Sequence, residues 1–146
     1  MIRPVKWKDG RVVMIDQTLL PGQLVEITIE TPEQMWEAIK SLRVRGAPAI
    51  GIAAAFGAAQ AAFAYEGESS EGCAGRVREV CDYLATSRPT AVNLFWALDR
   101  MKSCLDGCGG ADVEQIRQRL LTEAGNILEE DIEMCRQLSF HGADLL

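Results

Sequence analysis

Hydrophobic and polar residues alternate over the first 30 positions, which is the pattern of strands with one buried face. Three runs show it: Val5-Lys6-Trp7, Arg11 to Ile15, and Leu24 to Ile29. Asp9-Gly10 lies between the first two runs and is a strong signal for a hairpin turn. Pro21-Gly22 predicts the turn before the third run. We therefore expect a three-stranded antiparallel β-meander over residues 1–30, with Asp16-Gln17-Thr18 in a polar connection.

From Thr31 onward the hydrophobic period becomes helical, and about five helices are expected over residues 31–146. Thr31-Pro32-Glu33-Gln34 is a capping box that starts the first helix, which should end near Arg43. A flexible loop is expected over residues 66–72, followed by a third helix that runs through Leu84. The fourth helix should start at Pro89. A long fifth helix should start at the cap formed by Asp112 and Gln115, and end at His141-Gly142. The predicted fold class is α+β, a meander followed by a helical bundle.

The second of these helices differs from the others because it has no polar face. It is expected to start at Pro48, since proline suits the first helical position, and its one polar residue before Glu66 is Gln60. A helix that is apolar all round lies in a core or in a membrane. The run barely reaches spanning length and consists mainly of alanine and glycine. These small residues favour a central helix that other helices approach closely.

The start of this helix is a candidate anion site. Ala47 falls near the N-cap, where it cannot satisfy the free N–H groups as Ser, Thr, Asp or Asn would. Free N–H groups, the positive end of the helix dipole and the neighbouring Arg45 together favour a bound anion. Gly46 has no Cβ and would let a ligand approach the backbone. A tight turn with Arg45 paired to a carboxylate is the alternative.

A second junction has the same construction. Arg88 directly precedes Pro89, and an apolar helix follows. Thr90 and Asn93 add neutral donors that suit sugar hydroxyls. Here Ser87 or Thr90 is a possible helix cap, which weakens the argument for an anion. A capped helix with a surface arginine is the competing interpretation.

Composition narrows the function classes. The net charge of −6 argues against a general nucleic-acid or anionic-membrane surface, but a small phosphorylated ligand needs only local positive charge. Five cysteines without a Cys-x-x-Cys pair, and a single histidine, make a metal site unexpected. We expect reduced structural thiols, no cofactor and a cytoplasmic location. The N-terminus has no apolar signal core. The apolar ending Leu145-Leu146 suggests a chain cut before a further segment.

Three stretches carry a resemblance to a known family. They are residues 15–21 (Ile-Asp-Gln-Thr-Leu-Leu-Pro), 44–51 (Val-Arg-Gly-Ala-Pro-Ala-Ile-Gly) and 87–96 (Ser-Arg-Pro-Thr-Ala-Val-Asn-Leu-Phe-Trp). The chain resembles the N-terminal part of methylthioribose-1-phosphate isomerases of methionine salvage. These belong to a superfamily with ribose-1,5-bisphosphate isomerases and regulatory subunits of translation initiation factor 2B. The resemblance covers essentially the whole chain but somewhat under half of a usual family member.

The resemblance implies sugar-phosphate binding by Arg45, Gly46, Ala47 and Arg88, and an enzyme that is a homodimer. It also implies that the family's catalytic cysteine and aspartate lie in a Rossmann-like second domain, which this sequence does not contain. We therefore assign no catalytic residue and expect the chain alone to be inactive. Three alternatives stay open: a regulatory or scaffolding subunit of the initiation-factor-2B type, a ribose-1,5-bisphosphate isomerase-like protein, and a free-standing helical interaction module.

Overall fold

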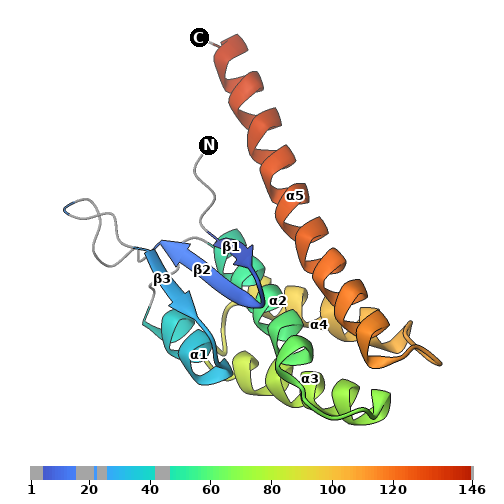
Figure 1. The fold of residues 1–146 in the computed structure, drawn as a ribbon. Coiled ribbons are helices and arrows are strands. Elements are labelled where there is room, and N and C mark those ends of the chain that lie inside the picture. Colours follow the sequence, from blue (N-terminus) through green and yellow to red (C-terminus); the bar gives the residue numbers. More distant parts are fainter. Residues whose placement is uncertain (1–4, 16–21, 23–25, 42–46, 146) are drawn as a thin grey trace.

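The computed structural model describes residues 5–15, 22, 26–41 and 47–145, apart from the side chains of 15, 47, 48 and 135–145. Three strands form one antiparallel sheet in the order β1-β2-β3, and five helices follow (Figure 1). The elements are β1 (Val5–Lys8), β2 (Arg11–Ile15), β3 (Glu26–Ile29), α1 (Pro32–Lys40), α2 (Ala47–Ala64), α3 (Ser70–Ala85), α4 (Val92–Asp106) and α5 (Val113–Leu145). The predicted meander followed by a helical bundle is confirmed.

The hairpin between β1 and β2 forms where the sequence predicted it. Lys8 pairs with Arg11, so the loop has two residues, and both have positive φ: 50° at Asp9 and 83° at Gly10. Two successive positive φ angles match the right-handed twist of the flanking strands. Alternate residues such as Val12 and Met14 are then buried against the helices.

α2 is the centre of the molecule. It contacts β1, β2 and each of the other four helices, and every residue from Ile50 to Ala62 is buried (Figure 1). The predicted central helix is confirmed, and its alanines and glycines explain why neighbours approach it from all sides. None of the helices in the described part of the chain combines the length and apolar character needed to cross a bilayer.

Gln60 is the polar exception on α2, and its buried side chain connects the helix to the sheet. Its amide nitrogen Nε2 donates to the carbonyl oxygens of Ile29 at 2.6 Å and Gly10 at 3.2 Å. A buried amide is tolerated when it is hydrogen-bonded. These two bonds hold the hairpin turn and the end of β3 against α2.

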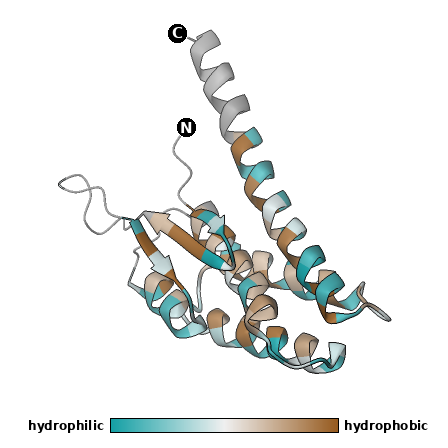
Figure 2. Cartoon of the chain, in the orientation of Figure 1, coloured by the Kyte–Doolittle hydropathy of each residue, from teal (hydrophilic) through white to brown (hydrophobic). Residues whose placement is uncertain are grey.

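The amphipathic helices pack around α2 as their sequence period predicts. The coloured part of α5 alternates hydrophobic and hydrophilic bands (Figure 2), and its buried residues include Ile116, Leu120, Ala124 and Ile127. The capping boxes at Thr31 and Asp112 are confirmed, because each of these side chains accepts a hydrogen bond from the N–H group three residues later.

Several helix boundaries differ from the prediction, among them the end of α1, which is at Lys40 and not near Arg43. α3 begins at Ser70, inside the expected loop over residues 66–72, because Ser69 caps it by accepting from the Gly72 N–H. α4 begins at Val92 and not at Pro89, because residues 88–91 form a turn closed by Ala91 N–H to the Arg88 carbonyl. α5 runs past His141-Gly142 to Leu145, since one glycine costs a helix only about 1 kcal/mol.

Candidate functional site

The two predicted arginine junctions are described to different extents. Arg45 and Gly46 lie outside the described residues. Ala47 is the first residue of α2, one position before the predicted start. Arg88 is half-buried in the turn between α3 and α4. The structure therefore describes the backbone at the start of α2 and all of the second junction, around Arg88.

The N-terminal turns of α2 and α4 lie against each other, although 42 residues separate Gly51 from Asn93. A Cβ atom on Gly51 would lie 2.9 Å from the Asn93 carbonyl oxygen and 3.4 Å from the Cβ of Ala97. Only glycine allows this approach without displacing α4. Gly51 is in the first turns of α2, and Asn93 is the second residue of α4. The positive ends of two helix dipoles are thus brought close together.

The N-terminus of α4 is not capped by a side chain. Its N-cap residue is Ala91, in an extended conformation with φ −83° and ψ 100°, and it makes no side-chain cap hydrogen bond. The expectation that Ser87 or Thr90 caps this helix is wrong: the Ser87 hydroxyl instead donates to the Leu84 carbonyl at 2.6 Å, at the end of α3. The main objection to an anion at this junction is therefore removed.

Arg88 differs from the other arginines with described side chains. Each of those contacts a carboxylate or a backbone carbonyl: Arg11 with Glu30, Arg76 with Glu79, Arg78 with Asp106, Arg100 with Glu123 and Glu130, Arg117 with Glu114, and Arg119 with the Gly107 carbonyl. Within the described part of the chain, the Arg88 guanidinium has no such partner. A half-buried arginine whose guanidinium has no protein partner is well suited to bind an anionic ligand.

The opposite end of α2 is closed by the protein itself. Arg117 of α5 donates from Nε to the Ala62 carbonyl at 2.9 Å and from an Nη atom to the Tyr65 carbonyl at 2.6 Å. These are carbonyls of the last turn of α2, where a cation is favoured by the dipole. The negative end of α2 is therefore neutralised within the fold.

Cys73, Cys81 and Cys104 are not activated nucleophiles. Burial raises the pKa of the Cys81 thiol to about 12, and burial together with the neighbouring Cys108 raises the pKa of the Cys104 thiol to about 11. Burial also raises the pKa of Cys73. A catalytic thiol has a lowered pKa, so these three behave as structural residues, as expected. No group of three His, Cys, Asp or Glu residues suited to a metal ion occurs among the residues that the structure describes.

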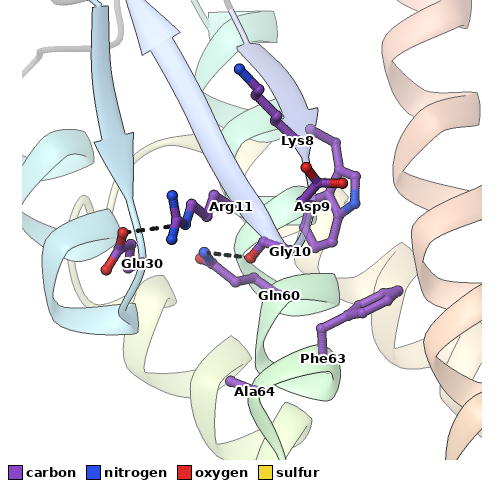
Figure 3. A pocket seen from close by; sticks show the side chains of 9 residues that line it. Lys8, Asp9, Gly10, Arg11, Glu30, Gln60, Phe63 and Ala64 are labelled. Carbon is purple, nitrogen blue, oxygen red and sulfur yellow. Dashed lines mark hydrogen bonds and ion pairs between the residues drawn. The ribbon is translucent and has the colours of Figure 1, made fainter.

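A shallow cavity of about 800 Å³ lies at the far end of α2 from these junctions. It is bordered by the β1–β2 turn and by Gln60, Phe63 and Ala64 of α2 (Figure 3). Thirteen residues of helix separate Ala47 from Gln60, or roughly 20 Å. Arg11 and Glu30, which line this cavity, form an ion pair with each other. The sequence analysis did not predict this cavity, since its walls come from segments that are distant in sequence.

Comparison with known proteins identifies the family of this chain. The model of the initiation factor 2 subunit family matches residues 43–146. The chain belongs to this family. Among curated family relatives it is 50% identical over 145 residues to a 5-deoxyribose 1-phosphate isomerase of Moorella thermoacetica, covering 99% of this chain and 41% of that protein. It is 46% identical over 144 residues to a methylthioribose-1-phosphate isomerase of Geotalea daltonii, covering 99% of this chain and 42% of that protein.

Two solved structures of the family share the fold. The 5-methylthioribose 1-phosphate isomerase of Pyrococcus horikoshii aligns with a TM-score of 0.95 and 37% identity, over 100% of this chain and 41% of that one. The delta subunit of translation initiation factor eIF-2B from A. fulgidus aligns with a TM-score of 0.92 and 39% identity, over 100% of this chain and 42% of that one. The chain thus spans about two fifths of the length of these relatives.

Proposed function

We propose that this chain forms the phosphate-binding part of an aldose–ketose isomerase that converts 5-methylthioribose 1-phosphate to 5-methylthioribulose 1-phosphate in methionine salvage, in the cytoplasm, as a homodimer. The observation that carries the proposal is Arg88, a half-buried arginine whose guanidinium has no described protein partner, next to the uncapped start of α4. The names of the relatives support a sugar 1-phosphate as the ligand.

The chemistry explains why charge neutralisation matters. A phosphate on C1 locks the sugar ring as an acetal, so the ring must open before a proton or hydride can move between C1 and C2. In this proposal Arg88 and Arg45 hold the phosphate dianion, and the backbone N–H groups that start α2 and α4 bind its oxygens. Gly46 and Ala47 give the ligand access to the backbone. Holding the phosphate in place fixes C1 and C2 relative to an acid and a base.

In this proposal the arginines supply binding but not the acid or base. We therefore expect residues 1–146 alone to show no isomerase activity, with turnover requiring the acid and base that the family resemblance assigns to a second domain. Measurable conversion of methylthioribose 1-phosphate by the purified 146-residue chain would contradict this expectation.

The experiment that tests the proposal is calorimetric titration with methylthioribose 1-phosphate, 5-deoxyribose 1-phosphate and inorganic phosphate. Arg88→Ala should weaken sugar-phosphate binding by about 1.5–3 kcal/mol, the value typical of a charge-assisted hydrogen bond. Arg78→Ala is the matched control. It removes the same charge as Arg88→Ala, but from an arginine that is paired with Asp106 on the surface. Equal affinities for Arg88→Ala and the unaltered protein would remove Arg88 from the site. The preferred sugar then identifies the substrate.

A second function is favoured by one observation, the close structural match to the eIF-2B delta subunit. In that case the fold would act as a regulatory or scaffolding subunit, and the arginine junctions would not be needed for catalysis. A protein at its natural length that binds the sugar phosphate but shows no isomerase activity would support this second function over the first.

A further inference from the structure

The turn that carries Arg88 is held by hydrogen bonds on both sides. On the side of α4, the Ala91 N–H donates to the Arg88 carbonyl at 3.0 Å. On the side of α3, the N–H and the hydroxyl of Ser87 both donate to the Leu84 carbonyl, at 3.1 Å and 2.6 Å. The side chain of Ser87 is fully buried. The backbone on either side of Arg88 is therefore fixed to the helix ends.

A third contact reaches this turn from α1. Trp36 donates from Nε1 to the Thr86 hydroxyl oxygen at 2.9 Å, and Thr86 in turn donates to the Tyr83 carbonyl at 2.6 Å. The Trp36 ring also stacks on Tyr83, with the ring centroids 6.0 Å apart and the planes 24° apart. Trp36 thus contacts the C-terminal end of α3 and its C-cap residue Thr86, which lies two positions before Arg88.

We infer that Trp36 is a positioning residue that holds the Arg88 turn against α1, and so fixes the direction in which Arg88 presents its guanidinium to a phosphate group. This inference rests on the proposed function. A guanidinium binds a phosphate strongly only when its N–H donors face the phosphate oxygens, so a small displacement of the turn lowers affinity without removing the charge. Trp36 itself does not touch the ligand.

The test replaces the donor but keeps the aromatic ring. Trp36→Phe removes Nε1–H and preserves stacking on Tyr83. In the protein at its natural length, it should raise the dissociation constant for methylthioribose 1-phosphate by about 3- to 10-fold, as expected for one lost hydrogen bond. Trp7→Phe is the control for the same substitution, because Trp7 packs on Phe56 and Phe63 on the other side of the fold. Thr86→Val removes the acceptor, and combining it with Trp36→Phe should weaken binding no further than either change alone.

A second measurement does not depend on ligand binding. Amide hydrogen exchange at Ser87 should become faster in Trp36→Phe and stay unchanged in Trp7→Phe, with melting temperatures alike in the two variants. A Trp36→Phe protein with unaltered affinity and unaltered Ser87 exchange overturns the inference. If Arg88→Ala still weakens binding in that case, the proposed function stands without it. If Arg88→Ala has no effect on binding, the proposed function fails, and Ser87 exchange decides whether Trp36 fixes the turn.

Discussion

The helix N-termini of this protein are of two kinds. α1, α3 and α5 each begin with a side chain that satisfies a free N–H group: Thr31 accepts from Gln34 at 3.1 Å, Ser69 from Gly72 at 3.1 Å, and Asp112 from Gln115 at 2.8 Å. α4 begins at Ala91 without such a bond. The capped ends complete the fold by themselves. The uncapped end lies beside the start of α2 and next to Arg88, where a ligand would complete it.

This contrast teaches that an open helix end is informative only together with its neighbours. α4 would be an ordinary exposed terminus if Arg88 were paired, as the other described arginines are. The close contact at Gly51 adds the start of a second helix to the same place. Substitutions can separate the roles of these features, because capped ends should affect stability alone and the open end should affect binding.

The largest expected effect is that of Gly51→Ala. In most helices this change is stabilising by about 1 kcal/mol, but here the new Cβ would lie 2.9 Å from the Asn93 carbonyl oxygen. Displacing α4 should cost about 1–3 kcal/mol of unfolding free energy, the usual cost of overpacking, and should also weaken sugar-phosphate binding. Denaturant unfolding and titration measure the two effects. Gly75→Ala is the control, since a Cβ there meets no atom within 4 Å. A stabilised Gly51→Ala variant would show that the two helix ends are not in close contact.

Converting the open end into a capped one should give opposite effects on stability and binding. Ala91→Asp provides α4 with a side-chain cap, so unfolding free energy should rise by about 0.5–2 kcal/mol. The same carboxylate occupies the N–H groups and repels a phosphate, so affinity should fall by about 1–2 kcal/mol. Ala91→Asn supplies the cap without the charge and separates the two causes. An Ala91→Asp protein that binds as tightly as the unaltered one would place the phosphate elsewhere.

The smallest effect is expected at a capped end. Asp112→Ala removes the bond from the Gln115 N–H and should cost about 1 kcal/mol, a decrease in melting temperature of about 3 °C. Sugar-phosphate affinity should not change, because Asp112 follows the C-terminal end of the 15-residue helix α4, whereas Ala91 lies at its N-terminal end. Thermal unfolding and titration of the same samples measure both. A clear loss of affinity would mean that the cap of α5 also supports the site.

Sequence signals predicted those parts of the fold that depend on short-range chemistry. Asp9-Gly10 fixed the hairpin turn, and the boxes at Thr31 and Asp112 gave correct helix starts, because each involves residues within four positions of one another. The start of α4 was misjudged because proline favours both a first helical position and a turn. The extra helical turns at Ser70 and beyond His141 show the same ambiguity for serine and glycine, which occur in loops as well as in helices.

The candidate site was predictable in part. The motif was enough to name Arg88 as a site residue. The sequence could not predict that its guanidinium has no described partner, because ion pairing depends on which carboxylates the fold brings near. The contact of Gly51 with Asn93 and the bond from Trp36 to Thr86 each join residues more than 40 positions apart. A local sequence pattern cannot predict contacts between residues so far apart in the chain. The placement of Arg45 and Gly46 in the site remains a prediction.

The bonds of Gln60 have a consequence for the order of folding. Its amide binds carbonyls of Ile29 and Gly10, which lie 31 and 50 positions earlier in the chain. An unpaired amide in a dry interior costs about 1–3 kcal/mol, so α2 gains its full burial only once the meander has reached its final position. Contacts over such separations form late, because the loops that they close lose more entropy. The sheet and the central helix therefore complete one another in a single cooperative step, and neither is expected to persist as an independent intermediate.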